Sequence, residues 1–214
     1  MATRKKMQQS SEEAGHKPFQ ALQLELQKAG YQEQNITFSS ARAITLGLLC
    51  ALPFAALWGV IYRLFLIDRA QLSDAGGSAF YIMVLIITAV SVFVHELLHG
   101  FGWAIFGKKG WTAIHFNISA LMPTCTCQAA LTKRQYLAGV LAPFLVLGLG
   151  SAAFLLIYPG TVSVVTMMVN FVAAGADLMI AISVCRQPKD VLIADHPSQA
   201  GYMAYSKIDV SYKK

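Results

Sequence analysis

The sequence predicts an all-α membrane protein with about four transmembrane helices and a small β-hairpin in one connecting loop. Hydrophobic residues make up 56% of the 214-residue chain and charged residues only 13%, which is too apolar for a soluble domain of this size. Four apolar runs each reach the roughly 20 residues that span a bilayer. A short segment between the second and third runs alternates apolar and polar residues, as strands do.

The four apolar runs define the expected spans and the domain organisation. They are Ala41 to Leu66, Ala79 to Phe106, Tyr136 to Tyr158 and Val162 to Cys185. Pro159-Gly160 is a turn signal between the last two runs, which predicts a tight helical hairpin there. We therefore expect one membrane domain over residues 41–185, a polar N-terminal segment over 1–40 and a C-terminal tail over 186–214.

The N-terminal segment is polar and carries no apolar core of the kind that signal peptides have, so we expect it to stay on the side of synthesis. Phe19, Leu22, Leu24 and Leu26 combine helical and strand spacing. They are compatible with a short amphipathic element that lies on the membrane surface.

The basic residues predict the orientation of the spans. Fifteen of the 17 fall before or at the very start of the first span, between the second and third, or after the fourth, whereas only Arg63 and Arg69 fall on the other side. The positive-inside rule then places both termini and the loop with the hairpin in the cytoplasm, in a multi-pass protein of the cytoplasmic membrane. The net charge of +6 follows from this topology, so no nucleic-acid partner is needed to explain it.

The second span contains His95-Glu96-Leu97-Leu98-His99. A helix turns once in 3.6 residues, so His95 and His99 lie on one face with Glu96 beside them, as in zinc proteases. Ionisable groups are costly in a membrane and usually mark a functional site. The alternative is a pair of histidines that hydrogen-bond to other helices beside a protonated Glu96.

A catalytic zinc needs three protein ligands and an open position for water. Asp177 is the single ionisable residue inside the fourth run. His95 lies 16 residues after Ala79 and Asp177 lies 15 after Val162, so both are about 22 to 24 Å along helices that run the same way. We expect Asp177 to be the third ligand; the alternative is an aspartate at a helix end near the lipid headgroups.

HELLHG in one span and Gly175-Ala176-Asp177-Leu178 in a later one resemble the membrane zincin peptidases, a group similar to the site-2 proteases. The resemblance extends through Lys133-Arg134-Gln135-Tyr136 and Ala142-Pro143-Phe144 to the tail around Asp195. It implies an HExxH helix and a distal aspartate that together hold Zn²⁺, and a metal-dependent peptidase activity.

The residue chemistry predicts a mechanism for such a site. Zinc held by His95, His99 and Asp177 would lower the pKa of a bound water toward 7. Glu96, which is not a ligand, would take the water's proton and return it to the leaving amine. Thr88 and Ser91 extend the polar face of the histidines, either to admit water or to bond to helices. Asn170 suits a helix contact better than an oxyanion donor.

The strict alternation in Ile114 to Ser119 predicts a strand, with Met122-Pro123-Thr124 as the turn of a hairpin. Such a strand either caps the bundle or offers an edge to an extended substrate. His115 fits a polar face better than a fourth ligand. Cys125 and Cys127 are two residues in a reducing compartment, too few for a metal site, and small loop residues are the better interpretation.

These observations favour a zinc-dependent intramembrane metalloprotease that cleaves membrane-associated proteins or peptides, with the lipid bilayer as its environment. The alternative is a non-catalytic membrane protein that binds metal or client helices through the same polar site. A pure binding protein has no need of Glu96 as a base, which is why the enzyme is preferred.

Overall fold

The computed structural model describes residues 18–69, 77–119, 122–197 and 199–207, so part of each predicted polar end lies outside the described residues. Four helical segments in this part of the chain are long and apolar enough to cross a membrane. They are Ser40–Leu66, Ser78–Phe106, Lys133–Ile157 and Thr161–Cys185. Each begins and ends within three residues of a predicted run, so the four runs are confirmed as helices.

Two of these segments change helix type along their length. The first comprises α2 (Ser40–Ile61) and a π-helical turn (Tyr62–Leu66), and a short 3-10 turn (Ile67–Arg69) follows it. The third comprises α4 (Lys133–Pro143), a π-helical turn (Phe144–Gly148) and α5 (Leu149–Ile157). The π-helical turn begins directly after Pro143, which has no N–H to donate to the preceding turn.

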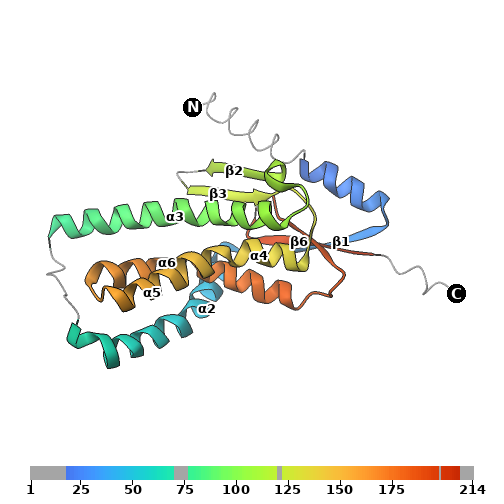
Figure 1. Cartoon of the computed structure of the whole chain (residues 1–214). Coiled ribbons are helices and arrows are strands. Elements are labelled where there is room, and N and C mark those ends of the chain that lie inside the picture. The colour runs from blue at the N-terminus through green and yellow to red at the C-terminus, as the bar shows by residue number, and fades with distance from the viewer. Residues whose placement is uncertain (1–17, 70–76, 120–121, 198, 208–214) are drawn as a thin grey trace.

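The other two segments, α3 (Ser78–Phe106) and α6 (Thr161–Cys185), are uninterrupted. The predicted turn at Pro159-Gly160 is confirmed, because α5 ends at Ile157 and α6 begins at Thr161. Figure 1 shows α3, α4, α5 and α6 running side by side, with both small sheets gathered near one end of the bundle.

The predicted hairpin is present, but its turn is elsewhere. β2 (Ile114–Ser119) pairs antiparallel with β3 (Met122–Cys127), and a 3-10 turn, Gly110–Ala113, leads into it. The prediction of a turn at Met122-Pro123-Thr124 is wrong, because Met122 is opposite Ser119 and Thr124 opposite Asn117. Strand pairing therefore includes Met122, Pro123 and Thr124, which the sequence had assigned to the turn.

The structure also contains a four-stranded sheet that the sequence did not predict. The chain is therefore mostly helical, and the prediction of an all-α fold needs this correction. Its strands are β1 (Tyr31–Thr37), β4 (Leu131–Thr132), β5 (Leu192–Asp195) and β6 (Gly201–Lys207), in the order β1-β6-β5-β4 with antiparallel neighbours. The described parts of the two polar ends thus pair with each other directly. β1 carries almost no apolar alternation, and its partner β6 comes from the far end of the chain, so local patterning provided little signal.

The apolar residues near the N-terminus belong to a helix, of which residues 18–28 are described. Phe19, Leu22 and Leu26 are buried against the four-stranded sheet, where they meet Met203 and Tyr205. The expectation of an element on the membrane surface is therefore wrong for this face, since the sheet covers it. Leu24 points away and is 57% exposed.

Helices α2 and α6 cross where neither has a side chain. A Cβ placed on Gly47 would lie 2.9 Å from the backbone nitrogen of Ala176. A Cβ placed on Gly175 would lie even closer to the backbone carbonyl oxygen of Gly47. Small residues permit such close contact between membrane helices. This crossing fixes α2 against α6 immediately beside Asp177.

We predict that Gly47→Leu destabilises the protein by about 1–3 kcal/mol, because the new side chain must push two backbones apart. Thermal unfolding of the purified protein in detergent measures the effect. Gly59→Leu is the matched control, since Gly59 lies on the same helix and a Cβ placed there would have nothing within 4 Å. Equal melting temperatures for the two variants would contradict the close crossing.

Candidate metal centre

The structure brings His95, His99 and Asp177 together inside the helical bundle. The Nε2 atom of His95 lies 3.0 Å from Oδ2 of Asp177, and that of His99 lies 3.4 Å from Oδ1. One donor atom from each residue falls within 4.8 Å of the others, so the three could hold a metal ion. Both histidines are buried. The expected meeting of the second and fourth spans at this depth is confirmed.

The detailed geometry fits a cation at the centre of the three side chains. Among the described residues, Oδ2 of Asp177 is buried and has no hydrogen bond of good geometry, although Nε2 of His95 is 3.0 Å away. A buried carboxylate oxygen in this position is free to bind a cation that the two imidazoles share. Two imidazoles and one carboxylate are a common ligand set for catalytic zinc.

A backbone carbonyl orients the second histidine. Nδ1 of His99 lies 3.0 Å from the carbonyl oxygen of Gly139 on α4. A carbonyl can only accept, so Nδ1 donates its hydrogen and the neutral ring keeps the lone pair of Nε2 for the metal position. The contact requires α3 and α4 to be close. A Cβ on Gly102 would lie 2.6 Å from the Cα of Gly139.

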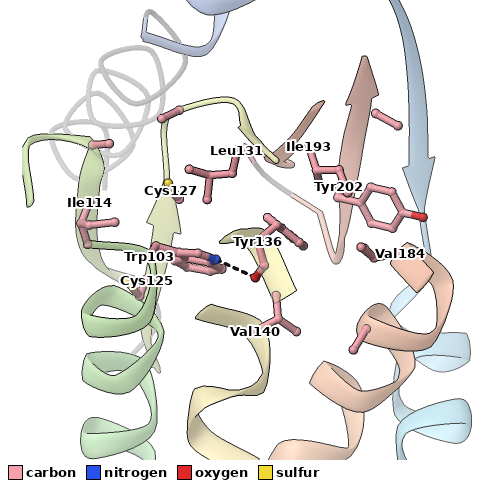
Figure 2. Close-up of a cluster of buried hydrophobic side chains, with 14 of the residues drawn as sticks. Trp103, Ile114, Cys125, Cys127, Leu131, Tyr136, Val140, Val184, Ile193 and Tyr202 are labelled. Atoms are coloured by element: carbon pink, nitrogen blue, oxygen red, sulfur yellow. Dashed lines mark hydrogen bonds between the residues drawn. The ribbon is translucent and has the colours of Figure 1, made fainter. Parts of the chain in front are cut away.

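Trp103, one turn after His99, extends this support. Its ring stacks on His99 at a centroid distance of 5.3 Å, and its Nε1–H donates to the carbonyl of Tyr136, 3.1 Å away. Figure 2 shows Trp103 and Tyr136 among the buried side chains that join α3, α4 and the sheets. The sequence did not identify Gly139 or Trp103 as site residues; a small residue inside an apolar span, which permits close helix contact, was the available signal for Gly139.

Glu96 lies beside the histidines on α3 and is partly buried. Its Oε2 accepts a hydrogen bond of 2.6 Å from the backbone N–H of Cys125 on β3. This contact fixes the carboxylate between the helix and the hairpin. Helix α3 therefore presents both histidines to α6 and Glu96 to β3.

The strand next to Glu96 is therefore β3 and not the predicted Ile114–Ser119 segment, which is β2. The N–H of Gln128 donates to the carbonyl of Ala113, so by antiparallel alternation the main chain of Asn117 faces β3. The main-chain groups of Phe116 and Ile118 then face away, toward the open edge of β2. Addition of a substrate strand to that edge stays a prediction, and it would place β3 between the substrate and Glu96.

The remaining polar candidates do not join the three ligand candidates among the described residues. His115 is exposed on β2. Thr88 donates its hydroxyl to the carbonyl of Val84, 2.8 Å away on its own helix, which is one of the two roles expected for it. Asn170 is buried on α6 and its Oδ1 has no partner among the described residues.

Cys125 and Cys127 are buried on β3 and are free thiols. Burial and the nearby Asp195 carboxylate raise the pKa of both, that of Cys127 to about 12. Both pack in the hydrophobic core and lie outside the group of three ligand candidates, so they act as small core side chains, in line with the preferred interpretation. They are nevertheless strand residues and not loop residues.

Asp195, the last residue of β5, lies outside the group of three. It is 8% exposed, and burial raises the pKa of its carboxyl to about 6, although donors from Cys127 and Tyr136 act in the opposite direction. A buried carboxylate with two donors is a structural element of the core, which the polar sequence of the tail did not indicate.

Residues 88–192 match the model of a protein family described as "Putative zincin peptidase". The matched region includes the HELLH segment, the hairpin and Asp177, and it ends shortly before Asp195. No curated protein and no solved structure matches the chain.

Proposed function

Since the chain belongs through residues 88–192 to the family described as "Putative zincin peptidase", we propose that it is a zinc-dependent intramembrane metallopeptidase. Its substrates are membrane-associated proteins or peptides. The observation that carries the proposal is the buried group of His95, His99 and Asp177 with Glu96 on the adjoining face of α3. The similarity to site-2 proteases is part of this proposal.

Zinc suits this group because two imidazole nitrogens and one carboxylate leave a fourth position open. A zinc ion bound there supplies a Lewis acid that acidifies a water molecule and polarises the scissile carbonyl. His99 is held for this role by Gly139, and the unpartnered Oδ2 of Asp177 is the oxygen available to the ion.

Glu96 serves as the general base. Oε2 accepts from the N–H of Cys125, which leaves Oε1 as the oxygen that takes the proton from the attacking water in this proposal. The same carboxyl then gives that proton to the nitrogen of the leaving amine as the C–N bond breaks. The proton is therefore conserved on Glu96 between the two steps, and no other donor is required.

The proposed setting is the cell membrane, with the sheet end of the bundle in the cytoplasm. Among the described residues, the basic side chains Lys28, Arg42, Lys108, Lys109, Lys133, Arg134, Arg186, Lys189 and Lys207 belong to segments at this end. Membranes favour such an excess on the cytoplasmic side. The metal site would then lie in the cytoplasmic half of the bilayer.

We predict that Glu96→Gln abolishes peptide cleavage and leaves zinc content close to native, because the amide keeps the shape but cannot accept the proton. Comparison of membrane proteomes from cells that carry the native chain or the variant identifies the lost cleavages. Metal analysis of the same purified proteins gives the zinc content. Glu25→Gln, an exposed residue of the N-terminal helix, is the control. Undiminished cleavage by Glu96→Gln would remove Glu96 as the base.

We predict that Asp177→Ala lowers zinc occupancy together with activity, since two histidines alone rarely retain a catalytic zinc. Metal content after dialysis against a weak chelator is the measurement. Asn170→Ala provides the control, because Asn170 is a buried polar residue of the same helix outside the ligand group. If Asp177→Ala kept native zinc affinity, a different third ligand would have to exist.

The orientation predicts the labelling of single cysteines in an otherwise cysteine-free chain. A cysteine at Ser206, exposed on β6, should be protected from an impermeant thiol reagent in intact cells. One at Gly77, at the opposite end of α3, should be labelled. Permeabilised cells are the control, in which both positions should react. The reverse pattern would invert the topology and place the metal site in the outer half.

A further inference from the structure

We propose that Asp195 is a positioning residue that holds strand β3 in register against Glu96. The inference rests on the proposed function in one respect, namely that Glu96 is the base. Asp195 touches neither the three ligand candidates nor Glu96 through any described hydrogen bond, so its effect passes through the strand.

Both carboxylate oxygens of Asp195 are used, and they join two elements. Oδ2 accepts from the backbone N–H of Cys127 on β3, and Oδ1 accepts from the hydroxyl of Tyr136 on α4, each at 2.7 Å. Hydrogen bonds to an ionised acceptor are about twice as strong as neutral ones. The side chain therefore ties the hairpin to the helix that also orients His99.

Two carboxylates from different elements share the same edge of β3. Glu96 accepts from the N–H of Cys125, and Asp195 accepts from that of Cys127. Residues two apart on a strand present their N–H groups to the same side, roughly 6.6 Å from each other. A slip of β3 by one residue would turn both donors away. The bond to Asp195 thus determines which N–H group meets Glu96.

Among the described residues, no neighbouring strand other than β2 pairs with β3 and holds it in register. The hairpin forms a two-stranded sheet of its own, separate from the four-stranded sheet that contains β5. On the edge that faces Glu96, Pro123 has no N–H to donate. Cys125 and Cys127 donate from this edge to the two carboxylates, so Glu96 and Asp195 supply the main-chain hydrogen bonds of β3 on this side.

Asp195 itself is held firmly by its surroundings. The hydroxyl of Tyr202, opposite Asp195 on β6, meets Ser183 at 2.9 Å and Gln187 at 3.0 Å at the end of α6. The ammonium of Lys133 donates to the carbonyls of Cys185 and Gln187 in the same region. Tyr202 therefore anchors β6 to the end of α6, which Lys133 joins to α4, and this gives a fixed point from which Asp195 reaches β3.

The test compares Asp195→Asn with Asp195→Leu in the full chain. Asparagine can still accept from Cys127 through its carbonyl and donate to the oxygen of Tyr136, whereas leucine of similar size can do neither. Asp190→Leu, at an exposed position of the same tail, is the control. The readouts are amide hydrogen exchange resolved at Cys125 and Cys127, zinc content, and kcat and KM for fluorescently labelled casein in detergent.

We expect the two amides in the native chain to exchange as slowly as those of the ladder residues Thr124 and Thr126. Asp195→Leu should speed their exchange roughly tenfold or more, because a buried donor loses its partner. It should also lower kcat roughly 10- to 100-fold, as loss of an outer-shell partner does, with native zinc content. Asp195→Asn should keep slow exchange and a kcat within about threefold of native, as the retained acceptor predicts.

Three results would overturn the proposal. Fast exchange at Cys127 in the native chain excludes the anchor, and this needs no variant that folds. An Asp195→Asn chain as inactive as Asp195→Leu would indicate a role for the negative charge itself. Native kcat in a folded Asp195→Leu chain would also contradict it. If instead the native chain cleaves neither casein nor any protein in the comparison of membrane proteomes, the proposed function fails, while the exchange data still decide whether Asp195 holds β3.

Discussion

The structure depends on the placement of two histidines and a carboxylate inside an apolar bundle. Polar groups removed from water are costly unless other polar groups or an ion satisfy them. His95, His99 and Asp177 meet this condition by converging within 4.8 Å, and their convergence requires α3 and α6 to lie at one depth. Much of the remaining architecture can be understood as support for that arrangement.

The support runs outward through backbone and aromatic contacts. Gly102 and Gly139 let α3 and α4 approach, so that a carbonyl reaches His99. Trp103 stacks on His99 and reaches Tyr136, whose hydroxyl in turn meets Asp195. Outer-shell partners of this kind fix the orientation of metal ligands. The C-terminal strands are therefore linked to the metal centre even though they follow the last membrane helix.

The parts of the molecule that the sequence predicted are those with a local signal. Span lengths follow from apolar runs, and the match of His95 with Asp177 follows from a fixed rise per residue. The β1–β6 pairing lacks such a signal, because both strands are irregularly patterned and far apart in the chain. Asp195 was equally hidden, since nothing near it indicates that Cys127 and Tyr136 converge on it. Pro123 led to the wrong prediction of a turn. It is tolerated in β3 because it lies on the edge that does not pair with β2, where no N–H is needed for strand pairing.

In the proposed site, two imidazoles and one carboxylate bind zinc, with no sulfur ligand. X-ray absorption at the zinc edge of the purified native chain tests this ligand set most directly. We expect only nitrogen and oxygen scatterers at about 2.0–2.2 Å, consistent with His95, His99, Asp177 and water. A sulfur shell near roughly 2.3 Å would instead implicate Cys125 or Cys127, and would contradict both the ligand assignment and the structural role of those thiols.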